Sequence, residues 1–477
     1  MLSPRRFIPV RIKTSLPALN KGLVWSLFYV GMLLLWTAAF TSTFSSWIFR
    51  KPLLIDTDTD LSIFTVPFLS FNLIFLASTF YIFIGFIVFY GRVKDKQIRA
   101  VQAHSHKIAF DSASEAGMCS IVIPARNEEA VIRNSVLRCL KQSYRNIEVI
   151  VVCHNCTDRT FELAQVGDDR VHAFDFNSKE AGKGLALNYG VSKAKGQYIL
   201  ILDADGYLSE DFIEKALPLF YEGNYAAVQG RYVPSNRNYN FITRMLALEG
   251  DLWSAPFMTC RDIEKRCPLG GTGYIIRKDV LLDVGGFANH LVDDYELSFR
   301  LFRKKQRIAY APLSINYDEK PPTIDFMLRQ RARWVKGFLS LMKSRVAEPR
   351  DILGNLYWLN PLSAFTSFGL LLIAAYSAFH NFILGYYPFE YAYLPFELWL
   401  VLNGGLLAGY TLALWKQYGT SGLRHAAWLP LYIPFSNYWM VIAIRALFVK
   451  SWANTKTMHG FVKELEVQIQ LDNKYHK

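Results

Sequence analysis

Two long uncharged stretches near the amino end constrain the fold of this chain more than any other feature. Residues 23–49 and 61–91 contain no Asp, Glu, Lys or Arg, and each is longer than the roughly 20 residues that cross a bilayer as an α-helix. Charged residues make up only 19% of the chain, against about 25% in soluble domains, which argues against a disordered or wholly soluble protein. We predict two transmembrane helices within residues 1–91, with a cleaved signal peptide as the alternative for the first stretch.

Similar stretches return near the carboxyl end. Residues 365–384 and 398–415 are uncharged and long enough to span a membrane. The segment 425–444 contains Pro430 and Pro434. Because proline removes a backbone donor, we predict a re-entrant or interfacial helix there, with a true span as the open alternative.

The distribution of basic residues predicts the orientation of the chain. Lys and Arg are frequent before residue 23 and directly after residue 91, whereas the loop between the two stretches carries more acidic than basic residues. Since basic flanks stay on the cytoplasmic side, we expect an integral protein of the plasma (inner) membrane with a cytoplasmic central region. The net charge of +13 then reflects membrane flanks and an anionic substrate, and does not require nucleic acid.

The central region, residues 118–346, has the pattern of an α/β domain. Short apolar stretches alternate with helical patterns, and this β-α-β-α-β order implies a mainly parallel sheet with ligands at the carboxyl ends of the strands. The predicted strands are 120–124, 147–153 and 198–202, and the predicted helices are 129–142, 157–165 and 183–194.

All six cysteines lie in this region: Cys119, Cys139, Cys153, Cys156, Cys260 and Cys267. A reducing cytosol disfavours disulfides. Cys153 and Cys156 have zinc-like spacing, but the spacing of Cys260 and Cys267 does not suit a common zinc ribbon. Ordinary buried thiols are the favoured interpretation.

The sharpest local motif is Asp203-Ala-Asp205, which follows the third predicted strand. Two carboxylates at the end of an apolar strand are costly unless their charge is compensated. Mg²⁺ prefers one or two carboxylates together with phosphate oxygens, so a metal site for a diphosphate is predicted here. A solvated turn, which Asp-Ala-Asp-Gly also suits, is the alternative.

A second acidic pair, Asp293-Asp294, precedes an amphipathic helix. Either residue could cap that helix, or one could be a general base at the mouth of a cleft. Just upstream, the glycines within 269–273 allow the backbone to approach a ligand closely.

The third motif is Gln330-Arg-Ala-Arg333-Trp334. On a helix, Gln330, Arg333 and Trp334 share one face. Arginine can hold a diphosphate through two hydrogen bonds, and a tryptophan ring can support a sugar. An interfacial helix, with arginine at the lipid headgroups, is the alternative.

In this order, the motifs resemble those of the membrane-bound family 2 glycosyltransferases, which include the cellulose, hyaluronan and poly-N-acetylglucosamine synthases. The resemblance covers residues 118–345. It implies an α/β GT-A glycosyltransferase domain inserted between transmembrane α-helices, and an inverting transfer from a nucleotide sugar. The matching elements are Ile123-Pro-Ala-Arg-Asn-Glu-Glu129, Gly182-Lys183-Gly184, Asp203-Ala-Asp205, Asp293-Asp294 and Gln330-x-x-Arg333-Trp334.

The resemblance also implies roles for single residues. Asp294 would be the catalytic base, and Asp203 and Asp205 would hold a divalent metal, Mg²⁺ or Mn²⁺, and the nucleotide diphosphate. The donor would contact Pro124, Arg126, Glu128, His154, Lys183, Asp203 and Arg333. The acceptor would contact Gly271, Thr272, Gly273, Asp293, Gln330 and Trp334.

The sequence departs from the family at two motifs. Many relatives have an Asp-Asp-Gly-Ser turn after the second strand, where this chain has Cys153-His154-Asn155-Cys156. His154 can still hydrogen-bond a base, and uracil remains the expected one. The acid pair is Asp-Asp rather than Glu-Asp, which preserves a carboxylate at Asp294.

The leading hypothesis is a transferase that elongates a β-linked polysaccharide from a UDP-linked sugar, with accessory export proteins as candidate partners. Transfer of one sugar to a membrane lipid is the alternative. A non-catalytic membrane protein on a transferase fold is a remote third, against which the intact acids argue. The predicted parts are membrane region 1–91, cytoplasmic linker 92–117, catalytic domain 118–346 with an interfacial helix near 322–345, membrane region 347–449 and tail 450–477.

Overall fold

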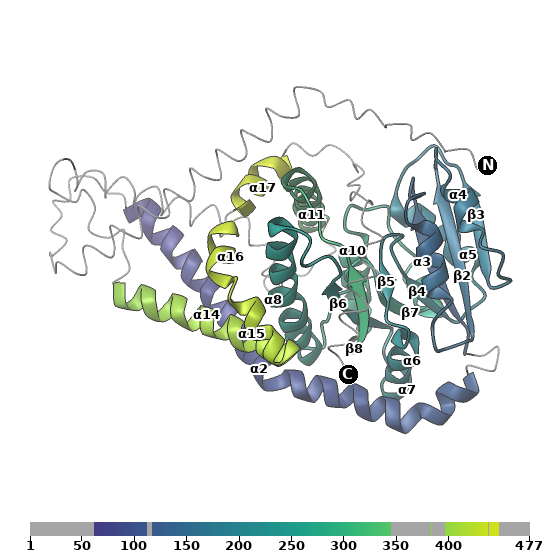
Figure 1. Cartoon of the computed structure of the whole chain (residues 1–477), viewed down its shortest axis with the longest axis horizontal. Coiled ribbons are helices and arrows are strands. Elements are labelled where there is room, and N and C mark those ends of the chain that lie inside the picture. Colours follow the sequence, from purple (N-terminus) through teal and green to yellow (C-terminus); the bar gives the residue numbers. More distant parts are fainter. Residues whose placement is uncertain (1–61, 112–116, 345–382, 384–395, 437, 448–477) are drawn as a thin grey trace, which may run out of the picture. The chain divides into compact units, whose positions relative to one another are not determined.

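The computed structural model describes residues 62–111, 117–344, 383, 396–436 and 438–447, and the element labels are those of Figure 1. The predicted span 23–49 and most of 365–384 lie outside these residues. The chain divides into two compact units, and the description below concerns the described residues of the larger one, Leu69–Thr366 with Leu398–Lys477.

An eight-stranded mixed sheet lies at the centre, in the order β3-β2-β1-β4-β7-β6-β8-β5 (Figure 1). β1, β2, β3 and β4 pair in parallel as predicted, but β7 pairs antiparallel with both β4 and β6. The prediction of a mainly parallel sheet is confirmed for β1 to β4, and in the other half β6 and β8 also pair in parallel, so the antiparallel pairs of β7 and β5 make the sheet a mixed one. The strands are β1 Cys119–Ala125, β2 Ile147–His154, β3 Val171–Phe176, β4 Tyr198–Ile201, β5 Tyr207–Leu208, β6 Ala227–Pro234, β7 Tyr274–Arg277 and β8 Ile308–Asp318.

The parallel half of the sheet explains why distant motifs meet. β2 and β4 are completely buried and β1 nearly so, as expected for parallel strands with both faces covered. In the register of β1 and β2, Ala125 lies beside Cys153, and β4 ends just before Asp203. The residues that follow these three strands therefore share one edge of the sheet.

The helices surround this sheet and extend beyond it (Figure 1). In the catalytic region they are α3 Ile132–Cys139, α4 Thr160–Ala164, α5 Lys183–Lys193, α6 Phe212–Ala216, α7 Pro218–Glu222, α8 Phe241–Ile263, α9 Lys278–Asp283, α10 Asp293–Arg303 and α11 Ile324–Lys343. Outside it are α2 Ser62–Asp111, α14 Phe396–Tyr418, α15 Thr420–Ala426, α16 Leu429–Phe435 and α17 Tyr438–Leu447.

The stretch predicted as a polar linker is mostly helical, because α2 continues to Asp111. Its Gln97 is fully buried, donates to the carbonyl of Lys215 at 3.0 Å and accepts from the backbone N–H of Leu313 at 2.8 Å. A buried amide with its hydrogen bonds satisfied is well tolerated. The polar composition of this stretch therefore attaches α2 to the catalytic domain.

The predicted spans 61–91 and 398–415 fall largely within α2 and α14. Among the helices that the structure describes, none combines the length and the apolar character needed to cross a membrane. Segment 425–444 is divided among α15, α16 and α17. The membrane spans and the re-entrant helix stay predictions.

Candidate active site

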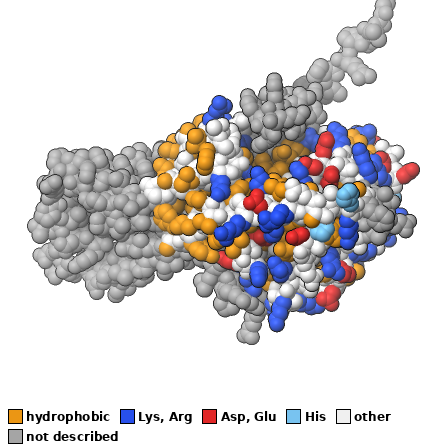
Figure 2. Space-filling view, turned by 90° about the horizontal axis from the view of Figure 1, so that it is seen from below, with side chains coloured by type: hydrophobic (Ala, Val, Ile, Leu, Met, Phe, Trp, Pro, Cys, Tyr) orange, Lys and Arg blue, Asp and Glu red, His pale blue; other side chains and the backbone are white. Residues whose placement is uncertain are grey.

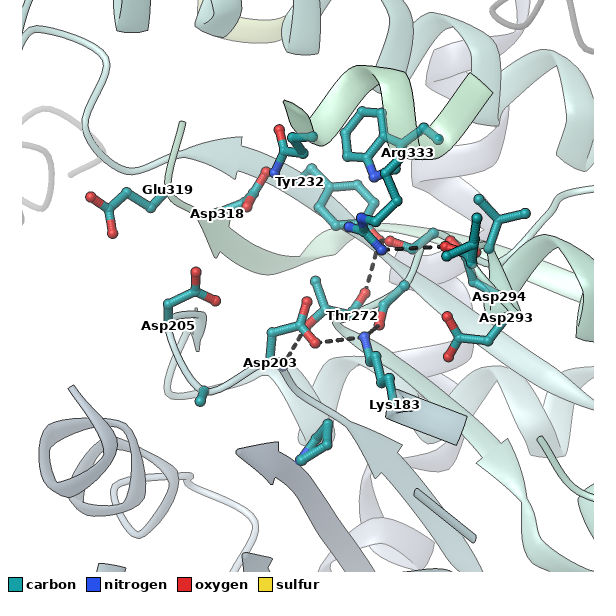
Figure 3. A pocket seen from close by; sticks show the side chains of 18 of the residues that line it. Lys183, Asp203, Asp205, Tyr232, Thr272, Asp293, Asp294, Asp318, Glu319 and Arg333 are labelled. Carbon is teal, nitrogen blue, oxygen red and sulfur yellow. Dashed lines mark hydrogen bonds and ion pairs between the residues drawn. The ribbon is translucent and has the colours of Figure 1, made fainter. Parts of the chain in front are cut away.

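A cavity of about 380 Å³ lies at the carboxyl ends of β1, β2 and β4. It gathers residues from motifs that are far apart in the sequence, several of which are shown in Figure 3. The predicted site residues that line it are Pro124, Arg126, Glu128, His154, Lys183, Asp203, Asp205, Gly271, Thr272, Asp293, Asp294, Gln330, Arg333 and Trp334.

Gly273 is the exception among the predicted residues, because it does not line the cavity. Its backbone donates to the carbonyl of Ile201 and accepts from the N–H of Gly230. Its φ is +62°, and a Cβ atom there would lie 2.4 Å from Asn316. These contacts explain the glycine through the sheet, and the acceptor contact at Gly273 stays a prediction that the cavity lining does not support.

Lys183 connects the two sides of the cavity from the first turn of α5. Its Nζ lies 2.6 Å from Oδ1 of Asp203 and donates to the carbonyl of Gly271 at 2.8 Å (Figure 3). The hydroxyl of Thr272 accepts from the backbone N–H of Asp203 at 2.9 Å. The loop after β4 and the glycine loop before β7 are thus held together.

An acidic cluster surrounds Asp205. Burial raises the pKa of Asp205 to about 7, and the negative charges of Asp203, Glu128, Asp318 and Glu319 add to the effect. Carboxylates that resist ionisation for this reason are stabilised by a nearby cation. The residues present therefore fit a divalent metal ion bound together with a diphosphate.

Asp293 and Asp294 form the first turn of α10. The residue before them, Val292, is the N-cap, and no side chain caps this helix, so the capping alternative is not supported. Burial raises the pKa of Asp294 to about 7, and the charge of Asp293 adds to the effect. A carboxyl group with a pKa near neutrality can accept a proton at physiological pH.

Arg333 and Tyr232 close the cavity near this acid pair (Figure 3). Arg333 donates to the carbonyl of Leu291 at 3.3 Å, and its positive charge favours the ionised forms of both aspartates. The hydroxyl of Tyr232 lies within hydrogen-bond distance of the carbonyls of Gly270 and Thr272. The guanidinium group of Arg333 therefore lines the cavity close enough to the acid pair to influence its ionisation.

His154 lies at the opposite end of the cavity, where β2 ends. Its Nε2 is 2.8 Å from the hydroxyl of Ser178, and its ring packs on Phe176 with centroids 5.0 Å apart. Burial lowers the pKa of His154. A neutral imidazole held in this way can exchange hydrogen bonds with a base.

Sequence reasoning missed a further wall of the cavity. α8 contributes Glu249, Gly250, Ser254, Phe257 and Met258, the end of β8 contributes Asp318, and the loop after it contributes Glu319 and Lys320. The signal for the second group was an acidic pair at the end of an apolar strand, the same pattern that identified Asp203. Helix α8 gave no such signal, since its cavity-facing residues form no recognisable motif.

The cysteines take no part in a shared metal site. All six are free thiols, five of them buried and Cys156 partly exposed. Within the described residues, no group of three or more His, Cys, Asp or Glu side chains could by itself hold a metal ion.

Comparison with known proteins shows to which glycosyltransferases the central region is similar. The family model described as "Glycosyltransferase like family 2" matches residues 116–337. A probable glycosyltransferase, YdaM of Bacillus subtilis, is 29% identical over 48% of this chain and 56% of its own length. The β-monoglucosyldiacylglycerol synthase of Nostoc sp. is 30% identical over 46% of this chain and 48% of its own length.

A relative from another branch is the poly-β-1,6-N-acetyl-D-glucosamine synthase of Staphylococcus aureus. It is 24% identical over 58% of this chain and 68% of its own length. The chain spans about half the length of the first two relatives. Residues 116–337 are therefore similar in sequence to the family 2 glycosyltransferases, and this region contains the mixed α/β sheet.

Proposed function

We propose that this protein is an inverting transferase that moves a sugar from a UDP-linked donor to the growing end of a β-linked polysaccharide at a membrane. One observation carries the proposal. The carboxyl group of Asp294, with a pKa near 7, shares a cavity with Lys183 and Arg333, the cations suited to a diphosphate. A base and a leaving-group site in one cavity are what direct displacement requires.

The transfer reaction needs one base, for which Asp294 is the candidate. A hydroxyl oxygen of the acceptor attacks the anomeric carbon while its proton passes to Asp294. The bond between that carbon and the diphosphate oxygen breaks, and the electron pair leaves with the diphosphate. Lys183 and Arg333 stabilise the charge that develops there. Attack from the face opposite the leaving group inverts the anomeric configuration.

A divalent ion, Mg²⁺ or Mn²⁺, would be held by Asp203 and Asp205 together with the diphosphate. It would supply positive charge to the leaving group. The acidic surplus around Asp205 supports this assignment. Pro124, Arg126, Glu128 and His154 would surround the nucleotide. The acceptor would contact Gly271, Thr272, Asp293, Gln330 and Trp334.

Transfer of a single sugar to a membrane lipid is the second candidate. The Nostoc relative is named for a glucosyldiacylglycerol, and its identity to this chain is higher than that of the Staphylococcus polysaccharide synthase. The apolar side chains of Phe257 and Met258 on the cavity wall would suit an acceptor with a hydrocarbon part.

We propose attachment to the plasma (inner) membrane, with the catalytic domain on the cytoplasmic side. Apolar side chains are exposed on α2 and α14, including Ile84 at 60% and Trp415 at 52%. Figure 2 shows apolar side chains gathered on one part of the displayed face and Lys and Arg over the neighbouring part. Such a combination suits a bilayer with anionic headgroups.

The test is a screen of the purified full chain in detergent, with Mg²⁺ or Mn²⁺, against a panel of nucleotide sugars. Release of UDP with one donor and a high-mass product is the expected result. A product that is only small and soluble in organic solvent would establish the lipid acceptor instead. Absence of nucleotide release with every donor, at confirmed folding, would overturn the proposed function.

A further inference from the structure

Glu249 of α8 is a buried carboxylate that the proposed chemistry does not use. It lines the cavity wall with 1% of its surface exposed. Arg331 of α11 lies 2.7 Å from Oε1, and the hydroxyl of Tyr438 of α17 donates to Oε2. The two oxygens of one carboxylate are therefore bound by two different helices.

Arg331 is enclosed by aromatic rings as well. Its guanidinium group lies 4.3 Å from the ring centroid of Trp334 and 5.7 Å from that of Trp439. An arginine over a tryptophan face is attracted by the ring electrons, and more strongly when both are shielded from water. The ring of Trp334, which lines the cavity, thus takes its position from the ion pair.

The ion pair also fixes the rotation of α11 about its axis. Neighbouring residues on an α-helix point in directions set by its 3.6-residue turn, so anchoring Arg331 determines where Arg333 points. Arg333 is, with Lys183, one of the two cations whose charges favour the ionised forms of Asp293 and Asp294. A small rotation of α11 would move this charge away from both acids.

A second contact connects the same two helices. Arg445 of α17 lies 3.3 Å from Asp325, at the start of α11. Since Tyr438 begins α17 and sits near the middle of α11, the two helices run in opposite directions side by side (Figure 1). α17 therefore contacts α11 at two places, at Arg331 through the ring of Trp439 and at Asp325 through Arg445.

The energetics of burial favour a role for the Glu249–Arg331 ion pair in positioning the helices over a role in stability alone. Taking two charges out of water is costly, and a buried ion pair often contributes little net stability compared with apolar residues of similar size. The contacts of Glu249 with Arg331 and Tyr438 are directional, however, and they hold α8, α11 and α17 in one arrangement.

We propose that Glu249 is a positioning residue which, with Arg331 and Tyr438, lets helix α17 set the orientation of Arg333 and Trp334 at the transfer site. This inference rests on the proposed function for its activity readout. Segment 425–444, whose relation to the membrane is open, would thereby control the active site.

Tyr438→Phe is the mildest test, because it removes one hydroxyl and keeps the buried ring. Tyr410→Phe in α14 is the matched control, since Tyr410 is also buried and lies outside the cavity. In the full chain, we expect Tyr438→Phe to lower kcat about tenfold, the effect of one hydrogen bond to a charged group. UDP binding and the unfolding temperature should match those of Tyr410→Phe.

Hydrogen–deuterium exchange supplies a readout that does not depend on activity. Exchange in residues 324–343 should rise in Tyr438→Phe and stay at the wild-type level in Tyr410→Phe. Glu249→Gln combined with Tyr438→Phe should be no slower in turnover than the slower single variant. If Tyr438→Phe and Tyr410→Phe show equal exchange in residues 324–343 and equal turnover, the inference is overturned. If the wild-type protein is inactive but exchange still rises in Tyr438→Phe, the result counts against the proposed function alone.

Discussion

The Nζ atom of Lys183 lies 2.6 Å from Oδ1 of Asp203 and 2.8 Å from the carbonyl oxygen of Gly271. One cation thereby bridges the loop after β4 and the glycine loop before β7. Burial works to lower the pKa of Lys183, but the charges of Asp203 and Asp293 outweigh it and hold the pKa above its ordinary value. Lys183 is therefore a permanent positive charge between the proposed donor and acceptor sides.

Removing this charge should weaken the donor site. For Lys183→Met we expect the KM for the nucleotide sugar to rise about tenfold or more, the scale of a lost hydrogen bond between charged groups. Lys193→Met, at the exposed end of the same helix, is the control. Steady-state kinetics with varied donor will measure both, and equal KM values would contradict the bridging role.

Replacing the proposed base, Asp294, should stop sugar transfer while the site still binds UDP. Asp294→Asn keeps the shape of the side chain but cannot accept a proton, so we expect kcat to fall by about 10²–10⁴. UDP affinity, measured by calorimetry, should change little. Asp293→Asn provides the neighbouring control with a smaller loss. Full turnover in Asp294→Asn would exclude it as the base.

The rate should depend on pH through Asp294. Its pKa is raised to about 7 by burial and by Asp293, and the base works in its ionised form. Turnover should therefore rise with pH through about 7 and level off above it. In Asp293→Asn the repulsion is gone, so the midpoint should move to lower pH. A midpoint that moves upward, or a flat profile between about pH 6 and 8, would contradict this assignment.

Comparing Gly271 with Gly285 distinguishes the effect of backbone strain from an effect on the acceptor site. Gly271 and Gly285 have φ values of +84° and +90°, so alanine at either position should cost about 1–2 kcal/mol in the free energy of unfolding. A Cβ atom at Gly271 would lie 3.4 Å from Oδ2 of Asp294, whereas one at Gly285 has no neighbour within 4 Å. Gly271→Ala should lower turnover and Gly285→Ala should not. If Gly271→Ala and Gly285→Ala have the same stability and also similar activity, the Gly271 loop has no acceptor role.

Metal removal should test the acidic cluster. Because the carboxyl group of Asp205 has a pKa raised to about 7 by burial and neighbouring acids, protons and a cation compete for it. We expect EDTA to abolish transfer, excess Mn²⁺ or Mg²⁺ to restore it, and half-maximal activation to need less metal as pH rises through about 7. Asp205→Asn should raise the metal requirement at every pH. Activity that is unaffected by EDTA would refute the metal assignment.

Local motifs allowed much of the site to be predicted. An apolar strand followed by Asp203 and a helix bearing Arg333 are short-range patterns, and fourteen of the fifteen predicted positions line one cavity. Gly273 lies outside the cavity lining, and a glycine that makes room for Asn316 looks, in sequence, the same as one that makes room for a ligand. The stretch predicted as a linker is mostly helical, and its Gln97 hydrogen-bonds Lys215, Leu313 and Ser314, which are more than 100 positions away and which a local pattern does not indicate.

The sequence by itself determined the order of the β-α units, the strand ends that carry acids and the resemblance to the family 2 glycosyltransferases, because periodicity and motif spacing are local properties of a chain. The tertiary structure alone decided the antiparallel pairing of β7 with β4 and β6, the role of α8 as a cavity wall and the three-helix contact at Glu249. Those features depend on pairings between residues up to 189 positions apart. Charge compensation and packing select such pairings only once the whole domain has folded.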